Sequence, residues 1–213
     1  MRTAKPHILL EKLLWEKGFE NVVGVDEAGK GPWAGPVVAS CVIIHSEKQV
    51  VKFVRDSKLM TRNQREKAYL RIIKKSSGFG IGTVGEQEID AIGIQKAVKK
   101  AMLMATKDLQ YKFKINISYI LVDGSKTMPL RKKNIQRIKK GGLYHYSISA
   151  ASVLAKVTRD RIMNKMAKKY PNYGFDRHVG YGTKLHMKNI QKYGLCPIHR
   201  KSFLPMKSIL LEN

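Results

Sequence analysis

The chain has 213 residues, with 41 Lys and Arg against 16 Asp and Glu, a formal net charge of +25. This length allows one sizeable domain with a buried core. The basic excess favours a polyanionic partner such as a nucleic acid, because neutralised phosphates release their counterions. No apolar run is long enough to span a membrane and no lipidation signal is visible, which argues against a membrane protein.

The two cysteines, Cys41 and Cys196, lie far apart in the sequence. They form neither a disulfide framework nor a zinc-ligand spacing, which is typical of a reducing compartment. Glu11 and Lys12 interrupt the apolar stretch near the N-terminus, so we expect no signal peptide there. These features together predict a cytoplasmic protein.

The first half of the chain alternates predicted helices and strands. A helix over residues 8–17 is followed by strands over 21–26 and 36–45, and the second strand is apolar enough to lie inside a sheet. Thr61 and Gln64 have capping-box spacing and predict the start of a helix over 61–75. A short glycine-containing strand over 79–85 comes next.

The second half continues with an amphipathic helix over 93–109, strands over 117–123 and 143–149, a long helix over 150–170 and one last helix over 183–193. This alternation without repeats predicts an α/β fold, a mixed central sheet flanked by helices. We expect the main domain to cover residues 1–170. Residues 171–213 are expected to form a helical C-terminal extension packed on the same body.

Three acids stand at the ends of predicted strands: Asp26, Glu27 and Asp123. Strand ends are where α/β sheets hold ligands, and carboxylates suit Mg²⁺ or Mn²⁺ better than zinc. Adjacent strand residues point to opposite faces, so either the strand breaks here, which Gly29 and Gly31 would permit, or Glu27 contributes from another angle or through its carbonyl. On these residues alone, a solvated acidic turn is an equal alternative.

Several ordered motifs resemble bacterial ribonuclease HII: VGVDEAGKGPWAGPVVAS, DSKLMTRNQREK, EIDAIGIQKAVKKAM, LVDGS, SAASVLAKVTRDRIM and GFDRHVGYGTKLHMKNIQKYGLCPIHRKSF. The resemblance implies an RNase H-like fold and an endonuclease that cuts the RNA strand of RNA/DNA hybrids and single ribonucleotides embedded in duplex DNA. It implies two Mg²⁺ or Mn²⁺ ions on Asp26, Glu27 and Asp123, and products with 5′-phosphate and 3′-hydroxyl ends. We expect a monomer.

Backbone amides in a tight loop can sense a 2′-hydroxyl, and Gly29, Lys30 and Gly31 are placed for it. The family usually has arginine where Lys30 stands, so the charge is kept but the bidentate fork is lost. By the same resemblance Tyr181 packs against the sugar at the ribonucleotide–DNA junction, and Ser57 and Lys58 lie near the phosphate backbone. Three further basic residues are expected either to contact phosphates or to be solvated surface charges: Lys156, Arg159 and Lys184.

The chain departs from the family pattern at one acid, because Gly142 stands where the pattern has aspartate. The hypothesis is a weakened or differently supported second metal site, with Asp160 as a less favoured substitute that pairs more readily with Arg159 or Arg161. Restoring the acid with Gly142→Asp is expected to raise Mg²⁺-dependent turnover. The main rival is a hybrid-binding module that has lost turnover with this carboxylate.

Other chemistries fit the sequence less well. His178, His186 and His199 lack zinc spacing and belong to no Ser/His/Asp motif, so we expect structural or backbone-contacting roles. Ribonuclease HIII carries an additional N-terminal domain and is therefore a weaker match. A generic basic RNA-binding protein is a third possibility. Four helix methionines are assigned to the core: Met102, Met104, Met163 and Met166.

Overall fold

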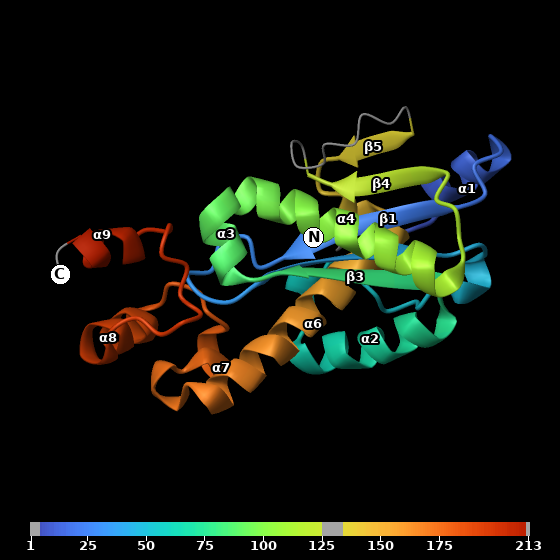
Figure 1. Cartoon of the computed structure of the whole chain (residues 1–213). Coiled ribbons are helices and arrows are strands. Elements are labelled where there is room, and N and C mark those ends of the chain that lie inside the picture. Colours follow the sequence, from blue (N-terminus) through green and yellow to red (C-terminus); the bar gives the residue numbers. More distant parts are fainter. Residues whose placement is uncertain (1–4, 125–133, 212–213) are drawn as a thin grey trace.

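The computed structural model describes residues 5–124 and 134–211, and its centre is a mixed β-sheet (Figure 1). The strand order is β3-β2-β1-β4-β5; β2 is antiparallel to both its neighbours, and β1, β4 and β5 are parallel. The strands are β1 (Val22–Ala28), β2 (Val37–Ile43), β3 (Gly78–Val84), β4 (Tyr119–Asp123) and β5 (Ile135–Ile138). The predicted α/β fold with a mixed sheet is confirmed.

Helices surround this sheet. Thr61 is the N-cap of α2 and forms the predicted capping box: its side chain accepts from the Gln64 N–H, and the Gln64 side chain accepts from the Thr61 N–H. The helices are α1 (Leu9–Glu16), α2 (Arg62–Lys75), α3 (Glu86–Ile92), α4 (Ile94–Phe113), α5 (Gly141–Tyr144), α6 (Tyr146–Lys169), α7 (Phe175–His178), α8 (Lys184–Tyr193) and α9 (Met206–Leu211). Among the helices described, none is long and apolar enough to span a membrane.

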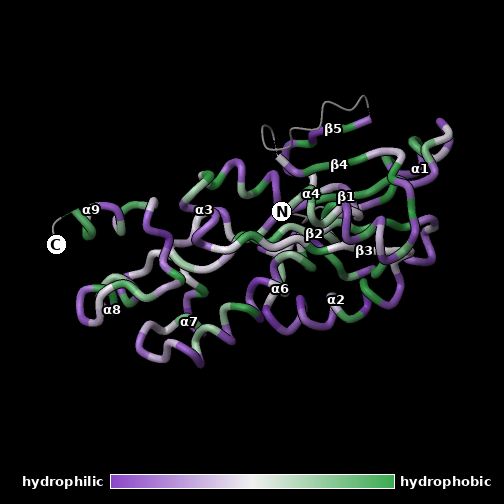
Figure 2. Tube along the Cα trace, viewed as in Figure 1, coloured by the Kyte–Doolittle hydropathy of each residue, from purple (hydrophilic) through white to green (hydrophobic). Residues whose placement is uncertain are grey.

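The core has two main layers, one on each face of the sheet, and the strands form its apolar centre (Figure 2). The α4 helix covers one face, and α6 with α2 covers the other. Gly80 and Gly82 of β3 face α4 so closely that an added Cβ would lie 2.0 Å from the carbonyl oxygens of Ala105 and Ala101. Glycine is therefore needed in this strand to let the helix backbone approach.

The structure differs from the sequence expectations in four features of the fold. Residues 143–149 are not a strand, because α5 ends at Tyr144 and α6 begins at Tyr146. Every residue from Tyr146 to Ala155 is buried, so this half of α6 carries no polar face that would reveal a helix. The real fifth strand, β5, was not predicted, and α9 follows the helix expected to be the last. Of the four helix methionines assigned to the core, Met104 is 40% exposed.

The segment after Tyr170 packs on the far end of α6 through a separate apolar cluster that includes Met163, Phe175 and Ile198 (Figure 1). The chain between β1 and β2 joins this cluster. The N–H of Gly35 donates to the Ile198 carbonyl at 2.8 Å, and the N–H of Trp33 donates to the Gly180 carbonyl at 2.8 Å. The C-terminal segment is thus bonded to the loop that follows the first two acids.

Candidate active site

The ends of two parallel strands place Asp26 beside Asp123. In the β1–β4 ladder Val25 is paired with Val122, and each aspartate is the next residue along its strand. Neighbouring strands lie about 4.8 Å apart, and residues at the same level point to the same face. The two carboxylates therefore meet at one edge of the sheet, although they are 97 residues apart in the sequence.

The first two acids lie in an unbroken strand. The β1–β2 pairing runs through Asp26–Ser40 and Glu27–Ala39 to Ala28, so the first of the two alternatives, a strand break at the acids, is wrong. Because side chains alternate along a regular strand, Glu27 can contribute only from a different angle than Asp26 or through its backbone carbonyl, the other alternative. Burial raises the pKa of Glu27, Lys30 and Lys58 lower it and Asp123 raises it, so its charge belongs to the same electrostatic cluster.

Burial raises the pKa of Asp26 well above its ordinary value, and the charges of Glu27 and Asp123 raise it further. The Glu27 N–H, 2.7 Å from Asp26 Oδ1, and the Ser152 hydroxyl act in the opposite direction by favouring the ionised form. No salt bridge among the described residues involves these three acids. The three carboxylates are therefore not neutralised by a directly paired cation, and a bound metal ion would stabilise their ionised forms.

The donor set fits a hard divalent cation that takes some of its ligands from elsewhere. Within the described part of the chain, no three His, Cys, Asp or Glu side chains are placed to hold an ion by themselves. Mg²⁺ is typically bound by one or two carboxylates together with water and substrate phosphates, not by a complete protein cage. The carboxylates at this sheet edge match that pattern.

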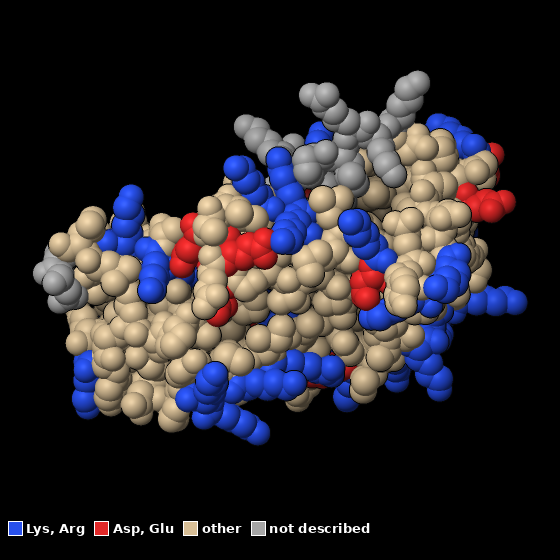
Figure 3. All heavy atoms as spheres, in the orientation of Figure 1, with Lys and Arg blue, Asp and Glu red and all other residues tan. Residues whose placement is uncertain are grey.

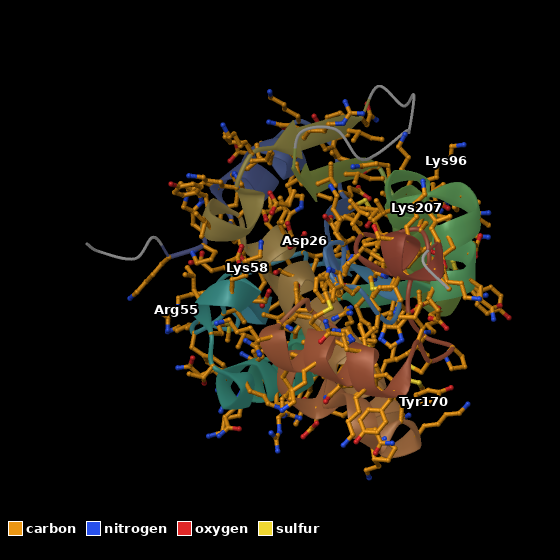
Figure 4. All side chains as sticks on the ribbon, turned by 90° about the vertical axis from the view of Figure 1, so that its left-hand side faces the viewer. Asp26, Arg55, Lys58, Lys96, Tyr170 and Lys207 are labelled. Carbon is orange, nitrogen blue, oxygen red and sulfur yellow. The ribbon has the colours of Figure 1, made fainter. Side chains whose placement is uncertain are left out.

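Ser57 and Lys58 lie next to these acids but differ in exposure. The Ser57 side chain is buried, and its hydroxyl lies 2.7 Å from that of Ser152. Ser152 is a neighbour of Asp26 that the sequence did not single out. Lys58 is exposed, and Figure 4 shows it to one side of Asp26. Ser57 is thus bonded within the protein, whereas the Lys58 charge is open to a ligand.

The Gly29–Gly31 loop and Tyr181 come together beside the acids. A Cβ on Gly31 would lie 4.0 Å from the Tyr181 ring, and the ring is 44% exposed. Gly29 has a φ of +92° and packs against Arg159 so tightly that a Cβ there would lie 2.1 Å from the arginine Nε. Only glycine fits at that position. On the face shown in Figure 3, Lys and Arg side chains are spread widely and Asp and Glu form a few small groups.

The family model for Ribonuclease HII matches residues 23–206. The chain belongs to the ribonuclease HII family. It is 48% identical over 197 residues to a Ribonuclease HII of Acetivibrio thermocellus, covering 92% of this chain and 74% of that protein. It is 45% identical over 201 residues to one of Caldicellulosiruptor bescii, covering 94% of each.

The fold agrees with this assignment. The crystal structure of ribonuclease H2 from Pyrococcus horikoshii OT3 superposes with a TM-score of 0.74 at 28% identity, covering 90% of this chain and 97% of that one. The chain is therefore an enzyme, a ribonuclease H, with the RNase H-like fold.

Gly142, which stands where the family pattern has aspartate, lies beside another acid, Asp56. Gly142 is buried in α5, and a Cβ there would lie 2.8 Å from Oδ2 of Asp56. The neighbouring Gly141 N–H donates to Oδ1 of Asp123 at 2.9 Å. Asp56 thus occupies space beside the position of the missing acid, and the sequence had not indicated this contact.

Asp160, the sequence-based substitute for that acid, is paired with cations. Its Oδ1 accepts from Lys156 at 2.6 Å, and its Oδ2 lies 3.6 Å from Arg65. The expected partners were wrong, because Arg161 pairs with Glu66 and Arg159 with backbone oxygens. These salt bridges engage both oxygens of Asp160.

Arg159 is neither the phosphate contact nor the solvated charge considered from the sequence, because it is 1% exposed and donates to the carbonyl oxygens of Pro36, Val179 and Ala34. Burial lowers its pKa to about 10, so it stays charged at neutral pH. Lys184 remains exposed, as a solvated charge or a phosphate contact requires.

The histidines contact the backbone, as the sequence predicted. Nδ1–H of His186 donates to the Tyr181 carbonyl at 2.9 Å, so its Nε2 accepts from Nε2–H of His199 at 3.1 Å. Nδ1 of His199 in turn accepts from the Cys196 N–H at 2.9 Å. His178 accepts from the Gly180 N–H at 3.2 Å. These bonds hold the segment that carries Tyr181.

Proposed function

We propose that this ribonuclease H cuts the RNA strand of RNA/DNA hybrids and the backbone at single ribonucleotides embedded in duplex DNA. The products have 5′-phosphate and 3′-hydroxyl ends. The observation that carries the proposal is the meeting of Asp26 and Asp123 at one sheet edge, beside the glycine loop and Tyr181. Acids for a cation and amides for a sugar hydroxyl thus adjoin each other.

Asp26, Glu27 and Asp123 are the proposed ligands of Mg²⁺ or Mn²⁺, with two ions in the working enzyme. Bound divalent ions supply activation of water and neutralisation of the phosphate charge. The protein positions the substrate: Lys30 and Lys58 attract the phosphates, Tyr181 packs on the sugar, and the Gly29–Gly31 loop approaches the 2′-hydroxyl. Ser57 holds Ser152 next to Asp26.

The test uses a DNA duplex with one ribonucleotide, an all-DNA duplex of the same sequence, and an RNA/DNA hybrid. We expect cutting of the first and third with Mg²⁺ or Mn²⁺, none with chelator, and none of the second. Extension of the product by a DNA polymerase identifies its 3′-hydroxyl. Asp26→Asn is expected to abolish cutting and keep binding, whereas Glu16→Gln, an exposed acid on α1, keeps both.

Gly142 supports a second candidate, a hybrid-binding protein with little or no turnover, because the family pattern has an acid there. Tight binding of the ribonucleotide duplex without any cutting would favour this candidate. We propose a monomeric cytoplasmic protein in either case. Equal cutting or binding of the all-DNA duplex would overturn both.

A further inference from the structure

Arg200 is a fully buried cation whose polar contacts are backbone oxygens. It is 0% exposed, and no salt bridge among the described residues involves it. Nη2 donates to the Gly29 carbonyl at 2.6 Å, Nη1 to the Lys30 carbonyl at 3.2 Å, and Nε to the Gly35 carbonyl at 2.9 Å. A buried charge needs such compensation, and here the loop between β1 and β2 provides it.

The backbone also ties Arg200 to this loop. Its own N–H donates to the Trp33 carbonyl at 2.8 Å, and the preceding residue, His199, forms a bridge with Ala34. The guanidinium lies 5.0 Å from the centre of the Phe203 ring, which limits its movement. The three loop carbonyls are therefore bound to a donor group of fixed geometry.

The orientation of these carbonyls determines where the adjoining amides point. In a trans peptide the C=O and N–H groups point in opposite directions. The Gly29 carbonyl shares its peptide with the Lys30 N–H, and the Lys30 carbonyl shares its peptide with the Gly31 N–H. With both carbonyls held by the buried arginine, the two N–H groups must point away from it.

These two N–H groups are open to a ligand. Within the described residues neither donates to a protein acceptor. Lys30 and Gly31 are exposed, and the Tyr181 ring lies next to Gly31. Successive free N–H groups of this kind form a concave site for an oxygen atom.

We infer that Arg200 is a positioning residue for ribonucleotide selection: it holds the Gly29 and Lys30 carbonyls so that the Lys30 and Gly31 amides face the sugar hydroxyl. The inference rests on the proposed function. It assigns the selectivity to a side chain that does not touch the substrate. Lys30 itself then serves through its backbone, and its side chain serves only as a charge.

The experiment measures binding, with Ca²⁺ in place of Mg²⁺, to the single-ribonucleotide duplex and to the matching all-DNA duplex. Arg200→Lys keeps the charge but cannot hold three carbonyls at once. We expect its preference for the ribonucleotide duplex to fall about tenfold, with all-DNA binding changed less than about twofold. In cleavage assays KM rises while kcat changes little.

Two controls separate selectivity from stability and charge. Ile72→Ala makes a cavity in the α2 core, away from the loop, and lowers the melting temperature without changing the preference. Lys30→Ala weakens binding of both duplexes equally, because the backbone amide remains. An unchanged preference in folded Arg200→Lys would overturn the inference.

If Arg200→Lys does not fold, the wild-type chain provides the second measurement. The amide resonances of Lys30 and Gly31 are expected to shift with the ribonucleotide duplex and much less with the all-DNA duplex. Equal shifts would overturn the inference even when the wild type prefers the ribonucleotide. A wild type without that preference would instead contradict the proposed function.

Discussion

A carboxylate oxygen of Asp56 lies 2.8 Å from the position that a Cβ on Gly142 would take. Real Cβ atoms do not come so close to another atom, so an acid at position 142 requires Asp56 to move. Asp56 is not free to do so, because its Oδ1 caps the following turn by accepting from the Lys58 N–H at 2.9 Å. Restoring the family acid therefore disturbs the segment that carries Lys58.

We predict that Gly142→Asp lowers the free energy of unfolding of the metal-free protein by about 1–3 kcal/mol, through crowding and charge repulsion. Adding Asp56→Asn, which keeps the capping oxygen and removes the charge, restores much of this loss. Denaturant unfolding of the three proteins measures the effect. Mn²⁺ is expected to raise the melting temperature of Gly142→Asp more than that of the wild type. If Gly142→Asp alone were as stable as the wild type, the predicted crowding between residues 142 and 56 would be contradicted.

Asp26→Asn is predicted to stabilise the metal-free protein by roughly 1–3 kcal/mol at neutral pH. The pKa of Asp26 is higher in the folded protein than in the unfolded chain, so as pH rises the carboxyl loses its proton more readily in the unfolded chain. The folded state is therefore destabilised increasingly as pH rises from the pKa of the unfolded chain through the pKa of the folded protein. Asparagine removes this penalty. Mn²⁺ should raise the melting temperature of the wild type and leave the variant nearly unchanged. If Asp26→Asn were less stable than the wild type without metal, the destabilising charge of Asp26 would be ruled out as the explanation.

The histidine chain predicts a loss of stability in mild acid. Burial lowers the pKa of His186 from 6.5 to about 4, so between these values the unfolded chain binds a proton that the folded chain does not. Its contribution to folding is complete above pH 6.5 and is lost as pH falls towards 4, by roughly 3 kcal/mol at most. Unfolding measured from pH 7 to pH 4 should show a shallower decline for His186→Gln. Parallel curves would argue against this role.

Asp160→Asn is predicted to lower stability by roughly 1–3 kcal/mol, because it removes the charge that Lys156 and Arg65 share in a largely buried position. It should leave Mn²⁺ affinity unchanged, since this carboxylate is already engaged by cations. Calorimetric titration of Mn²⁺ into both proteins decides the point. A clear fall in Mn²⁺ affinity would show that Asp160 does replace the missing acid.

The sequence by itself determined the elements with strong local signals. The apolar runs of β1 and β2, the capping box of Thr61 and the amphipathic α4 were all predicted and found. Local signals also placed Asp123 at the end of its strand, whereas β1 continues two residues past Asp26 to Ala28. Period and capping are properties of a few consecutive residues, so they can be recognised without knowledge of the fold.

The tertiary structure decided what depends on distant partners. The strand β5 has four residues and is defined by its pairing with β4, and the first half of α6 is buried on every side, so neither has a readable period. Arg159 and Arg200 resemble surface cations in sequence, yet they bind backbone oxygens in the interior. A cation is buried only where the folded chain brings enough acceptors to it, and all but one of these acceptors come from residues more than 100 positions away.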